Sequence, residues 1–204
     1  MTHIESVFVV DDDEAIREAV ASLVGEMGVR CEVFGSAEEF LEKYDGARPA
    51  CLVTDVRMLR MSGLELQEEL QSRGHNIATV VLTAYAETPV TVRAIKNGAV
   101  TLLEKPCRNL ELWDAIRNAL AQDHQLYERD RQRAEVAERL DSLTPSEKRV
   151  MDLVVAGKPN KAIANELDMS VRTVEVRRQS IFAKVGAGSV AELVRIAVES
   201  RPDE

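Results

Sequence analysis

Polar side chains that could carry chemistry follow four short apolar runs of this chain. A lone aspartate after a strand is ordinary turn chemistry. The carboxyl ends of neighbouring parallel strands meet at one edge of a sheet, however, so side chains at four such ends are expected to converge. The five side chains in question are Asp11, Asp12, Asp55, Thr83 and Lys105.

Three neighbouring carboxylates repel one another unless a hard cation lies among them. A few carboxylates, a carbonyl and water suit Mg²⁺, and a lysine with a threonine hydroxyl adds donors for a phosphoryl group. The acids therefore predict a Mg²⁺ site that also suits a phosphoryl group. An aspartate-nucleophile hydrolase is the competing enzyme class. It needs a second acid two residues after the nucleophile, and Arg57 at that position argues against it.

The elements that must position these residues alternate over the first 120 residues. Runs typical of strands are followed by segments of helical periodicity. Strict alternation predicts an α/β fold, a doubly wound five-stranded parallel sheet with helices on both faces. Its first and third strands lie side by side, so Asp11 and Asp12 should face Asp55, while Asp13 should cap the first helix. The strands are expected at 7–10, 31–34, 51–54, 79–82 and 100–103, and the helices at 14–27, from Ser36, 64–72, 89–97 and 110–120.

Residues 121–140 contain neither glycine nor proline and are mostly good helix formers. They predict a charged, mostly solvated linker helix. A weakly apolar stripe also leaves a two-chain coiled coil open. The stripe consists of Trp113, Ile116, Leu120, Tyr127, Ala134 and Ala137, interrupted by His124 and Arg131.

The remainder of the chain predicts a small all-α domain. Four short helices are expected at 145–156, 160–167, 171–185 and from Ser189 to about 200. Glutamates three residues after Ser36, Thr144 and Ser189 indicate capping boxes. The middle two helices of the tail, joined by a short turn, form a helix-turn-helix. The expected division is a doubly wound domain at 1–121, a helical linker at 122–142 and an all-α domain at 143–204.

The uneven distribution of charge along the sequence indicates that the two parts of the chain have different functions. The net charge of −9 is concentrated in residues 1–121, with 12 basic against 20 acidic residues, whereas 144–204 hold 10 against 9. No apolar run has membrane-spanning length, and the first residues do not resemble a secretory signal. Cys31, Cys51 and Cys107 form an odd set without metal spacing, which indicates reduced thiols and a cytoplasmic location.

Residues 1–121 resemble the receiver domain of bacterial two-component response regulators. The motifs, in order, are Asp11-Asp12, Asp55, Thr83-Ala84 and Lys105-Pro106. The resemblance implies that Asp12, Asp55 and the Arg57 carbonyl bind Mg²⁺ directly and that Asp11 acts through water. It implies that Asp55 accepts the phosphoryl group of a histidine kinase, that Lys105 and Thr83 hold the phosphoryl oxygens, and that the bond before Pro106 is cis.

Two positions depart from the family pattern. Leu59 stands where a proline is usual, and Leu102 stands where an aromatic switch residue is usual. Phosphorylation is still expected, because the five chemical residues are intact. A leucine cannot make a tyrosine-type hydrogen bond, so Tyr85 is a candidate to replace the aromatic in the relay.

The tail resembles the LuxR class of DNA-binding domains, and the whole arrangement resembles the FixJ-like regulators. The resemblance rests on 143–147, Gly157, 160–164, Leu167, Ser170, 173–176, Ile181, 184–185 and Leu193. On the second helix of the helix-turn-helix, Val174, Ile181 and Val185 should face the core, with Arg172 and Ala183 opposite. Candidates for base edges are Glu175, Val176 and Gln179, and candidates for phosphates are Lys161, Thr173, Arg177, Arg178 and Lys184.

These features predict a cytoplasmic transcription regulator that phosphorylation at Asp55 switches. Its only chemistry would be Mg²⁺-dependent self-phosphorylation and self-dephosphorylation. The expected partners are a sensor histidine kinase and promoter DNA, with RNA polymerase as a further candidate, no membrane, and a second copy of the chain after phosphorylation. Two alternatives stay open: a DNA-binding regulator that no longer depends on phosphate, and a phosphate-accepting module that binds a partner protein.

Overall fold

The computed structural model describes residues 5–84 and 87–199 of the chain. It divides into two compact units, Met1–Tyr127 and Glu128–Glu204. Within the described ranges, no helix has the length and apolar character needed to cross a bilayer. Cys31, Cys51 and Cys107 are all free thiols, as expected.

The N-terminal unit contains a parallel sheet whose strand order is β2-β1-β3-β4-β5. Side chains alternate along β1, so that Val7 and Val9 enter one core cluster while Phe8 and Val10 enter another on the opposite face. This alternation confirms a sheet buried on both sides. The strands are β1 Ser6–Val10, β2 Arg30–Phe34, β3 Ala50–Asp55, β4 Ala78–Thr83 and β5 Ala99–Glu104.

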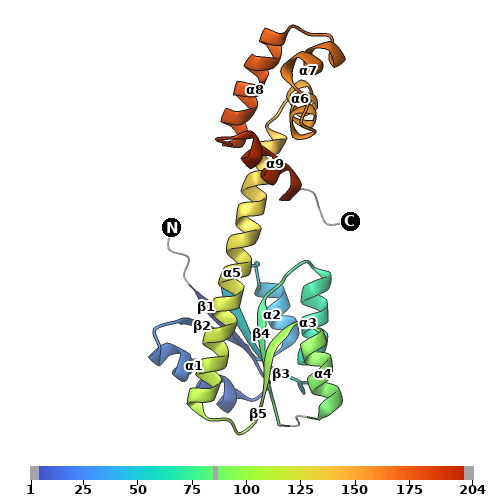
Figure 1. Ribbon diagram of the computed structural model, residues 1–204. Helices are drawn as coiled ribbons and strands as arrows, with labels where there is room; N and C mark the ends of the chain where they lie inside the picture. The colour runs from blue at the N-terminus through green and yellow to red at the C-terminus, as the bar shows by residue number, and fades with distance from the viewer. Residues whose placement is uncertain (1–4, 85–86, 200–204) are drawn as a thin grey trace. The chain divides into compact units, whose positions relative to one another are not determined.

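Helices cover both faces of this sheet (Figure 1). Helices α1 (Glu14–Glu26) and α5 (Asn109–Asp141) pack in the cluster that contains Val7 and Val9. The opposite face is covered by α2 (Ala37–Lys43), α3 (Gly63–Ser72) and α4 (Thr88–Lys96). The doubly wound architecture predicted from the alternation of elements is confirmed.

The expected fifth helix and the expected linker are one continuous helix, α5. Its exposed positions include Ala134 and Ala137, two members of the apolar stripe. Most positions of the linker are exposed, as predicted, but the side chain of Asp123 is fully buried. Asp123 accepts from the Ala50 N–H at the start of β3, a contact that helical periodicity cannot show.

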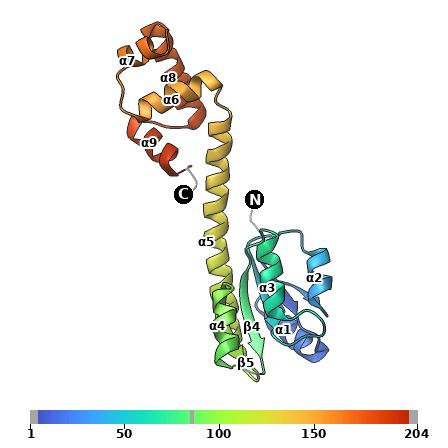
Figure 2. The same ribbon diagram turned by 90° about the vertical axis from the view of Figure 1, so that its right-hand side faces the viewer.

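The described residues of the C-terminal unit form helices joined by short turns, with no strand among them (Figure 2). Its core contains Val150, Ile163, Val174, Ile181 and Leu193, one or more from each helix. Asp168, in the turn between the second and third helices, has a φ of 49°. The helices are α6 Pro145–Val155, α7 Asn160–Glu166, α8 Val171–Val185 and α9 Val190–Glu199.

One of the three expected capping boxes forms as predicted, that of Thr144 and Glu147 at the start of α6. Ser36 accepts from the Glu39 N–H, but the Glu39 carboxylate accepts from Gly35 at 3.1 Å and not from the cap residue. At α9 the Glu192 carboxylate likewise accepts from Gly188, at 2.8 Å. A glycine precedes both caps, and its N–H replaces the N–H of the cap residue as the donor to the glutamate.

Candidate functional site

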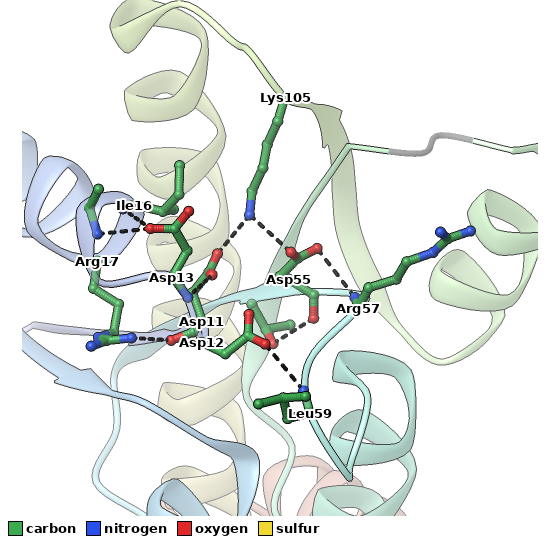
Figure 3. Close-up of polar contacts among 11 residues, drawn as sticks. Asp11, Asp12, Asp13, Ile16, Arg17, Asp55, Arg57, Leu59 and Lys105 are labelled. Carbon is green, nitrogen blue, oxygen red and sulfur yellow. Dashed lines mark hydrogen bonds and ion pairs between the residues drawn. The ribbon is translucent and has the colours of Figure 1, made fainter.

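Three acids meet at the carboxyl edge of the sheet, as the strand order requires (Figure 3). Val10 of β1 pairs with Thr54 of β3, so the residues that follow these positions are neighbours. Asp11, Asp12 and Asp55 each offer a carboxylate oxygen within 4.8 Å of the others. Asp11 is buried, Asp55 is partly buried and Asp12 is exposed. The acids thus form a pocket that is open to solvent on the Asp12 side.

Lys105 supplies the positive charge of this pocket. Its Nζ donates to Asp11 Oδ2 at 2.7 Å and to Asp55 Oδ2 at 3.0 Å. Burial alone would lower the pKa of Lys105, but the hydrogen bonds to the two carboxylates outweigh burial and raise it. The ammonium therefore stays charged, and it lies where it could reach an anion attached to Asp55. The Lys105-Pro106 bond is cis, as the resemblance implied.

The first loop of the pocket is held by its own backbone and by α1. Asp13 accepts from the Ala15 N–H at 2.9 Å, which confirms it as the cap of α1. Its N–H donates to Asp11 Oδ1 at 2.9 Å. Arg17 donates to the Asp11 carbonyl at 2.7 Å. Asp11 is therefore fixed in place, whereas Asp13 contributes to the helix and not to the triad.

The second loop follows β3 and makes a very close turn. The Arg57 N–H donates to Asp55 Oδ1 at 3.3 Å, and the Gly63 N–H donates to the Val56 carbonyl at 3.2 Å. A Cβ at Gly63 would lie only 2.1 Å from the Asp55 carbonyl oxygen. Glycine is therefore required here because backbone approaches backbone. Ser62 and Glu65 form a full capping box that then starts α3.

Thr83, expected to hold a phosphoryl oxygen, and Leu102, which stands where an aromatic switch residue is usual, lie on the two strands beyond Asp55. Thr83 is buried at the end of β4, and its carbonyl accepts from the Lys105 N–H at 2.8 Å. Leu102 on β5 is half-buried and packs in the cluster that includes Val81 and Ala94 beneath α4. Tyr85, the candidate replacement for the missing aromatic, lies outside the described residues.

A second candidate site is the outer face of α8. Val174, Ile181 and Val185 are buried, which confirms the predicted core face of this helix. The side chains expected on the other face are all exposed; they are Arg172, Glu175, Val176, Gln179 and Ala183. With α7 and the short turn before it, α8 forms a helix-turn-helix that presents these side chains to solvent.

The residues expected to contact phosphates differ in whether their side chains already form hydrogen bonds within the protein. Lys161 is exposed on α7. Arg178 donates one of its N–H groups to Asn160 Oδ1 at 2.6 Å, and Arg177 donates to the Met169 sulfur at 3.2 Å. The other two members bond residues near helix starts: the Thr173 hydroxyl shares a hydrogen bond with the Ser170 hydroxyl, and Lys184 donates to Glu147.

Sequence reasoning missed the wider role of Glu147, which it treated only as a helix cap. One carboxylate oxygen accepts from Ser180 at 2.7 Å, and the other accepts from Lys184 at 2.8 Å and from the Thr144 N–H at 2.8 Å. The hydrogen bonds from Lys184, Ser180 and Thr144 lower the pKa of Glu147 from 4.5 to about 2. Glu147 therefore ties the start of α6 to the C-terminal half of α8.

Two donors to the acid triad were also missed. The Leu59 N–H donates to Asp12 Oδ2 at 3.3 Å, and Arg17 reaches the Asp11 carbonyl (Figure 3). A hydrogen bond from a peptide N–H cannot be predicted from the residue type, since every residue except proline carries an N–H. The contact of Arg17 could have been predicted, because Arg17 lies one turn into α1, the helix that directly follows the acids.

A doubly wound sheet with an acid triad and a lysine at its carboxyl edge, followed by a helix-turn-helix, defines a receiver-type DNA-binding regulator. Comparison with known families agrees: residues 7–117 match the response regulator receiver domain, and residues 141–197 match the bacterial regulatory proteins of the luxR family. The chain therefore belongs to the two-component response regulators with a LuxR-type DNA-binding domain, and it is not a catalytic enzyme.

Several known proteins are similar to this chain over both of its domains. The transcriptional regulatory protein FixJ of Azorhizobium caulinodans is 40% identical over 94% of this chain and 91% of its own length. The response regulator protein TodT of Pseudomonas putida is 39% identical over 93% of this chain and 84% of its own. Among solved structures, the response regulator StyR is 38% identical with a TM-score of 0.89, over 96% of this chain and 98% of that one.

Proposed function

We propose that this regulator is switched by transfer of a phosphoryl group from a sensor histidine kinase to Asp55. The observation that carries the proposal is the position of the Asp55 carboxylate, which ends β3 inside the acid triad and accepts from Lys105 at 3.0 Å. In this reaction an Asp55 oxygen attacks the phosphorus of the donor phosphohistidine and the phosphorus–nitrogen bond breaks. An acyl phosphate remains on Asp55 and the imidazole is released. Lys105 and Thr83 would bind the phosphoryl oxygens.

We propose Mg²⁺ as the cofactor of this step. The donor set fits the ion, because it offers only oxygen ligands, from Asp12 and Asp55 directly, from the Arg57 carbonyl, and from Asp11 through water. The exposure of Asp12 leaves room for the waters that Mg²⁺ keeps. When bound, Mg²⁺ supplies positive charge that offsets the phosphoryl oxygens. Lys105, which stays charged in the pocket, would supply further positive charge to the phosphoryl oxygens.

We propose the domain roles as a receiver at 1–121, a helical linker at 122–142 and a DNA-binding domain at 143–204, acting in the cytoplasm. Leu102 packs beneath α4, so phosphorylation would be relayed by repacking there. Val92 and Ile95 on α4 are exposed, which supports a dimer through this surface after phosphorylation. Two tails on one two-fold site would add their binding energies, so the coupling need be only ~1–3 kcal/mol. RNA polymerase is a further candidate partner at the promoter.

Phosphorylation is tested by incubating the full-length chain with a radiolabelled small phosphodonor. We expect one acid-labile phosphate per chain, formed only when Mg²⁺ is present. Asp55→Asn and Asp12→Ala should abolish the labelling, because they remove the acceptor and a metal ligand. Asp13→Ala is the matched control, since Asp13 caps α1, and it should label like the natural chain. Equal labelling of Asp55→Asn would refute the assignment of the acceptor.

The switch itself is tested by a band shift on promoter DNA with and without the phosphodonor. The proposal requires tighter binding after phosphorylation of the natural chain and no change for Asp55→Asn. Equal binding in both conditions would favour a regulator that no longer depends on phosphate. An absence of DNA binding at low salt would favour the protein-interaction alternative.

The orientation of α8 on DNA is tested by two variants that should differ in kind. Gln179 is exposed on the outer face of α8, and Lys161 is exposed on α7. Gln179→Ala should relax preference at one base position and cost ~1–3 kcal/mol there. Lys161→Ala should weaken binding to all sequences alike and reduce the salt dependence by about one ion. Binding of both to specific and random DNA at several salt concentrations decides between them, and identical behaviour would contradict the proposed orientation.

A further inference from the structure

The loop after β3 carries a peptide N–H that the usual family pattern lacks. Leu59 stands where a proline is usual, and a proline has no N–H to donate. In this chain the Leu59 N–H donates to Asp12 Oδ2 at 3.3 Å, across the gap between the first and third strand ends (Figure 3). The bond therefore exists only because residue 59 is not proline.

The charges of the triad are not compensated equally. Lys105 donates to Asp11 and to Asp55, and each of these acids also accepts a backbone N–H from its own loop. Lys105 makes no such bond to Asp12, the most exposed acid of the three. Among the described residues, Leu59 is the sole hydrogen-bond donor to the Asp12 carboxylate. The orientation of Asp12 thus depends on this one contact.

The backbone around Leu59 is placed by contacts that do not involve its side chain. Arg60 has a φ of 69°, and the Gly63 N–H closes the loop onto the Val56 carbonyl at 3.2 Å. Leu59 as a whole residue is 77% exposed. Any effect of this residue on the triad should therefore come from its N–H and not from the leucine side chain.

We propose that the backbone N–H of Leu59 is a positioning donor that orients the Asp12 carboxylate for Mg²⁺. A carboxylate has two oxygens, and an N–H bonded to one of them restricts rotation while the other stays available to a metal. Carboxylates that bind metals are commonly held by such outer hydrogen bonds, and the loss of the partner lowers metal affinity. This inference rests on the Mg²⁺ site proposed above. It adds a determinant of affinity in the peptide backbone.

The test compares two variants of the full-length chain that separate the N–H from the side chain. Leu59→Ala keeps the N–H and removes most of the side chain, whereas Leu59→Pro removes the N–H. Titration with MgCl₂, followed by the amide shifts of the triad loops in ¹H–¹⁵N spectra, gives the dissociation constant directly. We expect Leu59→Ala to stay within about twofold of the natural chain and Leu59→Pro to bind about tenfold more weakly. Phosphodonor labelling of Leu59→Pro should recover at saturating Mg²⁺.

Two results would overturn the inference while leaving the metal site intact. One is a folded Leu59→Pro that binds Mg²⁺ as tightly as the natural chain or more tightly. The other is equal weakening in Leu59→Ala, which would assign the effect to the side chain. Failure of the natural chain to bind Mg²⁺ would instead overturn the metal site and this inference together.

A second measurement avoids the proline variant, in case it does not fold. The hydrogen exchange of the Leu59 amide in the natural chain should be slow without Mg²⁺ and stay slow at saturating Mg²⁺. Asp12→Ala removes the acceptor and should speed exchange of this amide, while the Arg57 amide, which bonds Asp55, is the internal control. Fast exchange of the Leu59 amide in the natural chain, or release of its protection by Mg²⁺, would contradict a positioning role.

Discussion

Asp123→Ala is expected to destabilise the N-terminal unit by about 3–5 kcal/mol, the usual cost of removing one partner from a buried ion pair. The Asp123 side chain is 0% exposed and accepts from the Ala50 N–H at 2.8 Å. Arg48, whose side chain is 14% exposed, lies 3.0 Å away through Nη2. The alanine variant would remove the carboxylate from beside the partly buried Arg48 guanidinium and the acceptor from the first N–H of β3, while the Arg48 bond to the residue 123 carbonyl oxygen can persist.

Urea unfolding followed by tryptophan fluorescence measures the change in stability of the N-terminal unit. Trp113 is the single tryptophan of the chain and packs against the core of the N-terminal unit, so its emission reports on that unit alone. The matched control is Asp114→Ala on the same helix, which removes an exposed pair with Arg117 and should cost less than about 1 kcal/mol. A midpoint for Asp123→Ala equal to that of Asp114→Ala would contradict the importance of the buried pair.

Glu147→Ala is expected to destabilise the C-terminal unit by about 2–4 kcal/mol, since it removes a charged acceptor from several donors at once. Glu147 is buried, and its carboxylate holds Thr144, Ser180 and Lys184 together. Glu192→Ala is the matched control, because Glu192 also accepts an N–H at a helix start but is only partly buried. Hydrogen exchange of the core amides Val150 and Ile181 should accelerate strongly in the first variant and weakly in the second.

The same carboxylate predicts how this stability depends on pH. Its pKa is about 2 in the folded chain against an ordinary value of 4.5, so folding favours the ionised form. The stabilisation is therefore complete above about pH 4.5 and is lost as the pH falls toward 2. Glu147→Ala should lack this part of the acid dependence. Equal acid dependence of the variant and the natural chain would show that other carboxylates control the loss.

Much of this architecture follows from patterns that are local in the sequence. The alternation of strand-like runs and helical segments predicts the doubly wound sheet, because each element is specified by its own periodicity. The rule that the first and third strands are neighbours then places Asp11 and Asp12 beside Asp55, as the strand pairing confirms. The buried face of α8 follows in the same way from Val174, Ile181 and Val185.

Other features depend on which segments meet, and only the tertiary structure decides that. The Leu59 N–H finds Asp12 across 47 residues, and Ala50 finds Asp123 across 73. The sequence of a single helix or strand predicts neither contact. Any residue except proline can donate an N–H, so Leu59 does not stand out. An aspartate in a charged helix, such as Asp123, is expected to face solvent. The sequence predicts Lys184 as a phosphate contact, but it does not show that Glu147, 37 residues earlier, accepts a hydrogen bond from it. The partner of a buried charge or a backbone N–H is chosen by long-range packing, and for that reason it could not be predicted from the chain alone.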